Sequence, residues 1–235
     1  MGGRGDRRSP PVQAAGQCAS HSLGRVLLAF DTATPAVTVA LHDGERIVAE
    51  STTIDARRHT ELLGPAIVGV LNSAGVRRQQ LTSIAVGVGP GPFTGLRIGL
   101  VTARMLGHVL DLPVHGICSL DVIARGVTVP GPFVVATDAR RKEVYWAAYD
   151  HDGHRTAGPD VATAAAIATD LPVAGAGAQL YPDAFPLRVP PQFPSATDLA
   201  TAVVSHEVPL LPTQPIYLRR PDAQPPGARK PVLSR

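Results

Sequence analysis

The chain has 235 residues, of which 44% are hydrophobic and 17% are charged, enough for one substantial core or for two small lobes that share one. This excludes a peptide-sized binding module, and no apolar run is long enough to cross a bilayer, which argues against a membrane protein. The net charge of +3 comes from the ends, because residues 1–25 carry four arginines against one aspartate and residues 219–235 carry five basic residues against one aspartate. The body between them is slightly acidic, so the basic balance does not predict a basic binding face.

The two cysteines indicate a reducing compartment, and the chain ends have the composition of segments outside the folded core. Cys18 and Cys118 form no disulfide framework, which is typical of a protein of the cytosol. Residues 1–24 lack the continuous apolar stretch of a secretory signal, and we interpret them as a disordered extension or an over-extended start. From residue 219 onward the proline-rich, basic composition is typical of a flexible tail.

The first half of the chain predicts three antiparallel strands, followed by helices and strands in alternation. Asp43-Gly44 is a tight hairpin signal between the second and third strands. Pro65 is expected to kink the first helix or to mark its effective start, and Pro92 suits a first helical position. Ser119 is a candidate N-cap for a short helix. The expected elements are strands at 25–31, 36–41 and 45–51, a helix at 57–75, a strand at 81–89, a helix at 92–110, a strand at 114–117 and a short helix from 120.

The second half repeats this pattern more loosely. In its second strand, Val144, Trp146 and Ala148 are expected to face one side of a sheet, and Tyr145 and Tyr149 the other. The βββαβα order of the first half predicts an α/β protein in which helices cover an open mixed sheet. The expected elements of the second half are strands at 132–138, 144–150 and 171–177, and a closing helix at 196–205.

A glycine-rich loop, VGVGPGPFTGLRIGL (86–100), joins a predicted strand to the clearest predicted helix. It lacks the glycine spacing and the lysine of a P-loop, and the GxGxxG pattern fails at Thr94. Pro90 and Pro92 each remove a backbone donor. The N–H groups near 93–95 could still face an anion, but a strand-to-helix turn is the favoured interpretation.

The helix after this loop carries small residues at every fourth position, at Gly95, Gly99, Ala103 and Gly107. A face without side chains indicates that something packs there at very short distance. With the helix at 57–75, this predicts a surface for a partner helix. On the opposite side, Arg97, Arg104 and His108 form either a solvated stripe or polar contacts in an interface.

Other motifs carry weaker signals. Asp31 and Asp138 each end a strand, where α/β proteins bind metals or phosphates, although a turn-forming role is about as well supported. The segment DHDGH (150–154) contains HxxH with flanking acids, but a turn is favoured over a metal site. Cys118 near His115 is expected to be a small apolar residue beside a strand. No GxSxG, HExxH or paired CxxC motif occurs in the sequence.

Five segments together resemble the bacterial TsaB (YeaZ) family. These segments occur in the same order as in that family across about residues 25–150, and a weaker match continues at 215–223. The sequences most specific to the family are GPGPFTGLR and DARRKEVYWA. The resemblance implies an α/β chain with the actin-like ATPase fold, in which two ribonuclease-H-like lobes have mixed β-sheets flanked by helices. The segments are FDTATPAVTVAL, RRHTELLGPAI, VGVGPGPFTGLRIGL, CSLDVIA and TDARRKEVYWAAYD. The implied organisation is a disordered extension (1–24), a first lobe (25–115), a second, reduced lobe with a closing helix (116–218) and a flexible basic tail (219–235).

The resemblance also implies a function. TsaB-like proteins take part in placing the N6-threonylcarbamoyl group (t6A) on the adenosine beside the anticodon of tRNAs that read codons starting with A. They are the non-catalytic partner, which pairs with the TsaD transferase through helices of the first lobe and works with the ATPase TsaE. Further expectations are a homodimer of the free protein, tRNA contact through the complex, no membrane association, and no intrinsic cofactor, with ATP or ADP at the complex interface.

Site residues follow from the resemblance and from the patterns above. No catalytic residue and no metal site are expected. The nucleotide-proximal residues are Asp31, Thr32, Thr94 and Asp138. The expected partner interface consists of His59, Leu62, Leu63, Gly95, Arg97, Gly99, Ala103 and Gly107.

Two departures from active enzymes of this fold favour the non-catalytic role. TsaD-like proteins carry an HxxxH metal pair, whereas this chain has Ser119 four residues after His115. Kinases of the fold have a DxGT-like turn after the first strand, and Ala33 occupies its glycine position. Two alternatives stay open, an autonomous ATPase or kinase that uses Asp31 and Asp138, and direct tRNA binding by the basic ends, which the acidic body disfavours.

Overall fold

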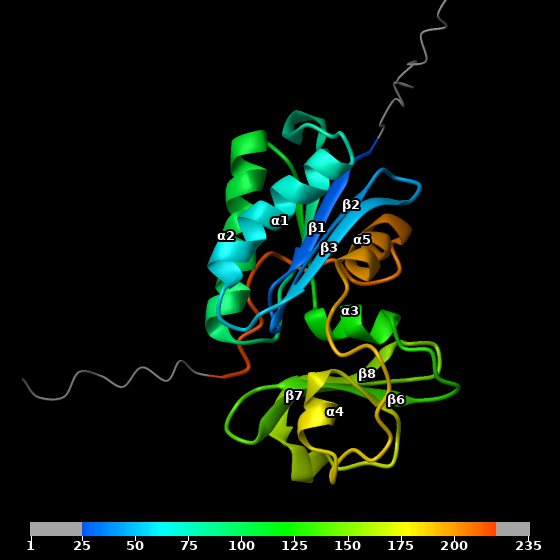
Figure 1. Ribbon diagram of the computed structural model, residues 1–235. Helices are drawn as coiled ribbons and strands as arrows, with labels where there is room; N and C mark the ends of the chain where they lie inside the picture. Colours follow the sequence, from blue (N-terminus) through cyan, green and yellow to red (C-terminus); the bar gives the residue numbers. More distant parts are fainter. Residues whose placement is uncertain (1–24, 220–235) are drawn as a thin grey trace, which may run out of the picture.

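The computed structural model describes residues 25–219 and builds them around two β-sheets. The predicted extension at 1–24 and the tail at 220–235 lie outside the described residues. Figure 1 shows the larger sheet with its helices above the smaller sheet, and the short helix α3 (Ser119–Arg125) between them.

The larger sheet has five strands in the order β3-β2-β1-β4-β5. The first three strands are antiparallel neighbours, and β1, β4 and β5 run parallel to one another. Strands β1 and β2 are buried along their whole length, as expected for strands covered on both faces. The strands are β1 (Leu27–Asp31), β2 (Ala36–His42), β3 (Ile47–Ile54), β4 (Ser83–Gly87) and β5 (Val114–Ile117).

Helices cover both faces of this sheet because its central strand carries apolar side chains on both sides. Leu28 and Phe30 lie in the core under α1 and α2, whereas Leu27 and Ala29 pack toward α5. Figure 1 shows α1 and α2 on one side of the sheet and α5 on the other. These helices are α1 (His59–Ser73), α2 (Phe93–Leu110) and α5 (Ala196–Ser205), and a 3-10 helix spans Arg78–Gln80.

The smaller sheet repeats the topology of the larger one. Its order is β8-β7-β6-β9, with three antiparallel strands followed by a parallel one, which matches β3-β2-β1-β4. Two mixed sheets with this shared order, flanked by helices, are the two ribonuclease-H-like lobes of the predicted actin-like fold. The elements are β6 (Phe133–Asp138), β7 (Glu143–Tyr149), β8 (Arg155–Thr163), a 3-10 helix (Ala164–Ile167), β9 (Val173–Ala174) and α4 (Ala176–Leu180).

The predicted alternation along β7 is confirmed. Tyr145 and Tyr149 lie in the cluster that contains Leu120 and Ile123 of α3. On the other face, Val144, Trp146 and Ala148 lie in or against the cluster around Phe185. The smaller sheet therefore has α3 on one face and the α4 region on the other.

Helix α1 begins at His59, well before Pro65, so of the two roles expected for this proline, marking the start of the helix is excluded. The prediction that Ser119 caps α3 is wrong. Cys118 holds the N-cap position of α3 and makes no side-chain cap, while Ser119 is its first helical residue. The Ser119 hydroxyl has another partner, the Asp31 carboxylate, which no local pattern could reveal.

Two strands differ from the expectation. Strand β8 (Arg155–Thr163) is not predicted by the sequence, because Gly158-Pro159 interrupts its pattern, but an edge strand tolerates proline. The strand expected at 171–177 is reduced to Val173–Ala174. Gly175 then takes φ +95° and lies against the backbone of Ala136, which turns the chain into α4.

Helix α5 closes the structure in an unexpected place. It follows the second sheet in the chain, yet it packs on β1 and β2 of the first sheet. Its cap is formed by Ser195, whose hydroxyl accepts from the backbone N–H groups of Thr197 and Asp198. Within residues 25–219, no helix is long and apolar enough to cross a membrane.

The turn at Gly175 generates a prediction about stability. Gly175→Ala places a methyl group onto the carbonyl oxygen of Ala136 and also strains the backbone, so it should lower the free energy of unfolding by about 2–4 kcal/mol. Gly153→Ala is the matched control, because Gly153 has φ +79° but nothing within 4 Å of an added Cβ. It should cost only about 1 kcal/mol. Urea unfolding of both variants measures the difference, and equal losses would contradict the close packing at Gly175.

Candidate functional site

The small-residue face of α2 packs against the protein's own first sheet. Gly95, Gly99, Ala103 and Gly107 are all buried. A Cβ added to Gly95 would lie 2.5 Å from the Thr32 carbonyl oxygen, and one added to Gly99 would lie 2.5 Å from the Thr32 hydroxyl. The prediction that these four residues meet a partner is therefore wrong. Their spacing correctly required a close neighbour, but spacing cannot tell a neighbour in the same chain from one in another chain.

The predicted interface residues of α1 are also largely enclosed. Leu63 is 1% exposed within the core, and His59 is 8% exposed with its Nε2 at 2.7 Å from the Thr34 carbonyl oxygen. Leu62 is half-buried at the edge of the same core. Of the eight predicted interface residues, Arg97 is the one that is exposed.

The outer face of α2 presents an apolar ridge instead. Val101 is 56% exposed, Met105 57% and Val109 70%, and their spacing of four residues places them in one row. Phe93, 40% exposed, begins the same row at the start of the helix. We call Phe93, Val101, Met105 and Val109 the α2 ridge. Arg97 occupies the position of this row between Phe93 and Val101, and Val101, Met105 and Val109 follow one another without interruption. Large apolar side chains in one exposed row are typical of a protein–protein contact.

Residues 211–219 run along the flank of α2, and we call them the strap. The Tyr217 ring stacks on Phe93 with centroids 5.3 Å apart, and the Tyr217 hydroxyl accepts a hydrogen bond of 2.9 Å from Arg97 Nε. The Arg97 guanidinium lies 3.7 Å from the centroid of the Phe93 ring. Arg104 donates to the Thr213 carbonyl oxygen. The two arginines therefore hold the strap rather than forming a merely solvated stripe.

Asp31 and Thr32, predicted to be near nucleotide, are both used inside the protein. The buried Asp31 carboxylate accepts hydrogen bonds from the Ala33 N–H (2.7 Å) and the Ser119 hydroxyl (2.5 Å). Burial raises the pKa of Asp31, and these two bonds and His59 oppose the rise. The Thr32 hydroxyl donates to the Gly95 carbonyl (2.7 Å) and accepts from the Gly99 N–H (3.1 Å). Both side chains are therefore engaged in hydrogen bonds within the protein.

A small cleft of about 230 Å³ lies where the loop after β1, the starts of α1 and α2, and the β6–β7 hairpin meet. Thr32 and Thr94, two of the predicted nucleotide-proximal residues, line it together with Arg57 and Arg140. Asp31 is not part of its lining, and Asp138 lies behind Arg140, paired with that guanidinium at 3.3 Å. The structure thus brings two of the four predicted nucleotide-proximal residues into one cleft, with two arginines that sequence reasoning missed.

A larger cleft of about 780 Å³, which the sequence did not indicate, lies between α3, the β7–β8 turn and residues 207–209. At its base, Asp121 accepts a hydrogen bond of 2.8 Å from the Tyr149 hydroxyl and lies 3.4 Å from Arg155 NH1. Burial raises the pKa of Asp121, although Arg155 and Tyr149 oppose the rise. No local motif marks these residues, because three separate elements supply them.

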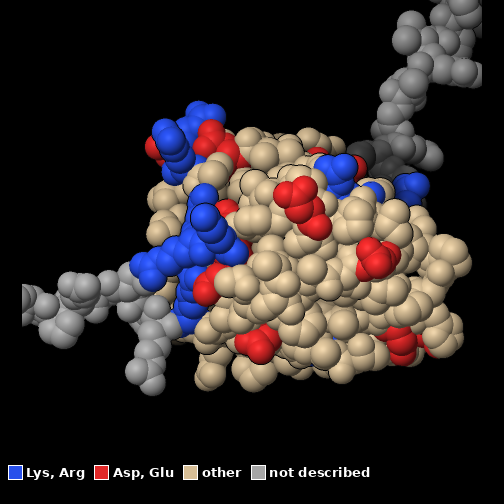
Figure 2. Space-filling view, turned by 90° about the horizontal axis from the view of Figure 1, so that it is seen from below, with Lys and Arg blue, Asp and Glu red and all other residues tan. Residues whose placement is uncertain are grey.

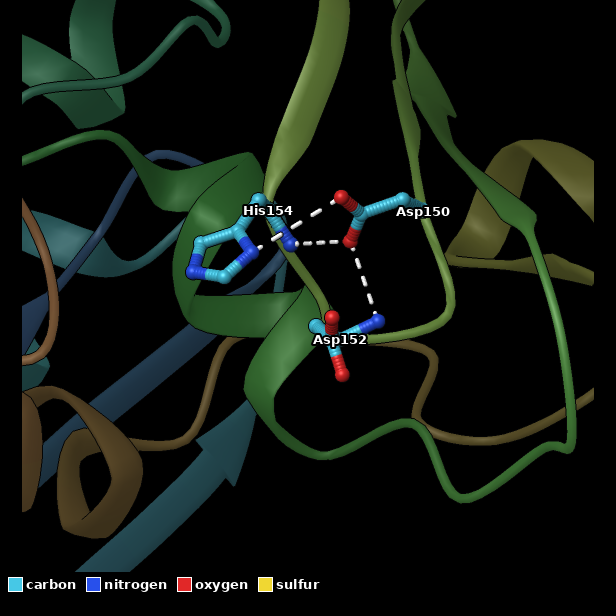
Figure 3. Close-up of side chains that lie close together, drawn as sticks. All are labelled: Asp150, Asp152 and His154. Carbon is cyan, nitrogen blue, oxygen red and sulfur yellow. Dashed lines mark hydrogen bonds and ion pairs between the residues drawn. The ribbon is translucent and has the colours of Figure 1, made fainter.

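The remaining candidates lie in the core and in a turn. Cys118 is fully buried, and burial raises the pKa of its thiol to about 12, so it is an unreactive core residue as expected. The DHDGH segment forms the predicted turn, with the Asp150 carboxylate accepting from the backbone N–H groups of Asp152 and His154 (Figure 3). Seen from the second-lobe end, Lys and Arg side chains gather along one side of the molecule and acidic residues are scattered (Figure 2).

The Asp31–Ser119 bond generates a prediction with a pH dependence. Ser119→Ala leaves the Asp31 carboxylate and the Gly89 N–H each without this partner, so the free energy of unfolding should fall by about 1–3 kcal/mol. Burial raises the pKa of Asp31, and the hydrogen bond from Ser119 lowers it. Loss of this bond therefore raises the pKa of Asp31 further and destabilises the folded protein when Asp31 is ionised. The loss should therefore grow from pH 4 to pH 7. Ser205→Ala, at an exposed helical serine, is the control, and an equal or pH-independent loss would contradict the assignment.

Comparisons with known proteins agree with this architecture. The family model described as TsaD: tRNA N6-adenosine threonylcarbamoyltransferase matches residues 46–207. An uncharacterized protein of Mycobacterium tuberculosis is 47% identical over 203 residues, which are 85% of this chain and 94% of that protein. The tRNA threonylcarbamoyladenosine biosynthesis protein TsaB of Escherichia coli is 36% identical over 129 residues, 54% of this chain and 55% of its own length.

A solved structure matches over a still greater part of its own length. YeaZ from Pseudomonas aeruginosa superimposes with a TM-score of 0.71 at 28% identity, covering 83% of this chain and 100% of that one. The resemblance noted in the five sequence segments therefore extends over both lobes. The chain belongs to the TsaB (YeaZ) family.

Proposed function

We propose that this chain is the non-catalytic scaffold subunit needed for t6A modification of the adenosine beside the anticodon, in tRNAs that read codons starting with A. Relatives from Escherichia coli and Bacillus subtilis, 36% and 34% identical, are named tRNA threonylcarbamoyladenosine biosynthesis protein TsaB. In this proposal the chain works in the cytoplasm, pairs with a TsaD-like transferase and cooperates with a TsaE-like ATPase. It contacts tRNA through that complex, and the free protein forms a homodimer.

The internal use of polar residues supports the non-catalytic role. Asp31 and Thr32 stand where enzymes of this fold bind phosphate. Here they form hydrogen bonds with the protein's own backbone and with Ser119. Ser119 in turn stands where TsaD-like proteins have the second histidine of their metal pair. Polar groups that are satisfied within the fold gain little from a ligand.

The α2 ridge is the single observation that carries the scaffold proposal. Its exposed apolar side chains are those that a helix presents to a partner, and the arginines beside them are fixed in place by the strap. We assign the contact with the TsaD-like subunit, and with a second copy in the homodimer, to this outer face of α2. The cost of exposing Val101, Met105 and Val109 to water in the free chain would be relieved on binding.

A nucleotide, ATP or ADP, is proposed at the junction of the complex and not as an intrinsic cofactor. The small cleft has two arginines and the start of α2, a combination that favours phosphate oxygens. Its volume of about 230 Å³ is below the range of 300–1,000 Å³ usual for a complete small-molecule pocket. A partner would have to supply the rest of the site.

The α2 ridge generates a binding prediction. Val101→Asp and Met105→Asp should each weaken co-purification with the TsaD-like subunit at least about tenfold, because a carboxylate would be buried in an apolar contact. Folding should be unaffected, since both side chains are exposed. Leu187→Asp, at a residue 52% exposed in the second lobe, is the matched control. Unchanged binding of both ridge variants would refute this interface.

The tRNA role has its own test, which does not depend on the interface. Depletion of the protein in its own host should lower t6A in total tRNA, measured by nucleoside mass spectrometry, and re-expression of the unaltered chain should restore it. Unchanged t6A after depletion would overturn the proposed function.

An ATPase assay on the purified chain alone distinguishes the scaffold proposal from the alternative of an autonomous ATPase or kinase. The scaffold proposal expects no ATP hydrolysis without the TsaD-like and TsaE-like proteins. Hydrolysis by the single chain that is lost in Asp31→Asn would favour the enzyme instead.

A further inference from the structure

The turn between β7 and β8 gathers three groups that can bind a metal ion. One ligand atom each from Asp150, Asp152 and His154 lies within 4.8 Å of the others, and Figure 3 shows the three residues around the turn. Carboxylate and imidazole together are a donor set typical of first-row transition ions, whereas Ca²⁺ and Mg²⁺ prefer oxygen ligands alone. The turn predicted from the sequence and a metal site are therefore compatible.

The backbone fixes the first of these ligands. Asp150 Oδ1 accepts hydrogen bonds from the N–H groups of Asp152 (3.0 Å) and His154 (2.8 Å). This leaves Oδ2 directed at the imidazole, 3.7 Å from His154 Nδ1. Hydrogen bonds that orient a ligating carboxylate are the usual outer support of a metal site. Two ligands of a tetrahedral zinc ion lie about 3.4 Å apart, so this pair is already near the required separation.

Charge around the turn favours a cation. At the neighbouring cleft, Asp121 faces Arg155, and Glu207 is paired with Arg125. Asp150 and Asp152, in contrast, have only histidines as ionic partners among the described residues, His154 and His151 respectively. The backbone bonds hold the pKa of Asp150 below its usual value, so it is ionised at neutral pH. Two carboxylates without an arginine or lysine partner create a local negative potential.

The position of the turn adds an independent observation. Asp152 and His154 line the mouth of the 780 Å³ cleft, whose size is in the range of small-molecule sites. Its base carries the hydrogen-bonded Asp121 and Tyr149 pair, so the cleft combines a polar floor with a ligand-bearing rim. A metal with three protein ligands keeps at least one coordination position for water or for an oxygen of a bound molecule.

We propose that Asp150, Asp152 and His154 form a binding site for a divalent first-row transition ion, with Zn²⁺ as the preferred occupant, at the mouth of this cleft. Asp152 is 60% exposed and has to move toward the other two ligands, which an exposed side chain does by rotation. The site is separate from the α2 ridge and does not depend on the t6A role.

The test is a titration of the full chain with ZnCl₂ by isothermal calorimetry, in a background of Cys18→Ser and His21→Gln that removes ligands outside the described residues. The expected result is one Zn²⁺ per chain. Asp152→Asn and His154→Gln should each weaken binding at least about tenfold. Both side chains are exposed, so circular dichroism and the unfolding midpoint should stay unchanged.

Two control variants sharpen the assignment. His151→Gln removes the other imidazole of the same turn, and His108→Gln removes an exposed imidazole of α2. Both should retain Zn²⁺ binding within about twofold. Absence of binding, or equal binding by all four variants, would overturn the proposal, as would a loss in His151→Gln as large as that in His154→Gln. Tighter binding of Ca²⁺ or Mg²⁺ than of Zn²⁺ would overturn the choice of ion.

Discussion

The close approach of α2 to the end of β1 is the contact on which the rest of the structure depends. The Thr32 hydroxyl donates to the Gly95 carbonyl and accepts from the Gly99 N–H, which brings a buried side chain into direct contact with the backbone of a helix. Only a helix without side chains at these positions leaves room for it. The first lobe is thereby fixed at the point where β1 ends, and the neighbouring Asp31 can reach Ser119 at the start of α3.

The polar groups at the end of β1 make their hydrogen bonds within the protein, and one of these bonds joins the two lobes. Asp31 links the end of β1 to α3, and α3 in turn packs on the second sheet through Leu120 and Ile123. The inner face of α2 is buried against the first sheet by the same packing. Only its outer face, with Val101, Met105 and Val109, is therefore accessible to a partner. The scaffold role that we propose would therefore follow from how the core is built.

The strap connects this outer face to the second lobe. Tyr217 and Thr213 contact the arginines of α2, and Arg219 at its end donates to the Ala139 carbonyl oxygen (2.7 Å) and pairs with Glu143 in the β6–β7 hairpin. That hairpin also supplies Arg140 to the small cleft. A partner that binds the α2 ridge would thus contact a surface that is physically joined to the cleft proposed for nucleotide. The metal-binding turn lies on the second lobe, away from these contacts.

Local sequence patterns by themselves determined most of the elements, because apolar periodicity, prolines and glycine turns act within a few residues. The three opening strands, α1, α2, α5, the faces of β7 and the turn at 150–154 could all be predicted in this way. Recognition of the family supplied the two-lobed fold. The role of the bare helix face was decided only by the tertiary structure, since Gly95 and Gly99 have the same spacing whether they meet Thr32 or another protein. The same holds for the partner of Ser119, the packing of α5 on the first sheet and the cleft at Asp121, because each joins residues that are distant in the chain and carry no local signal of one another.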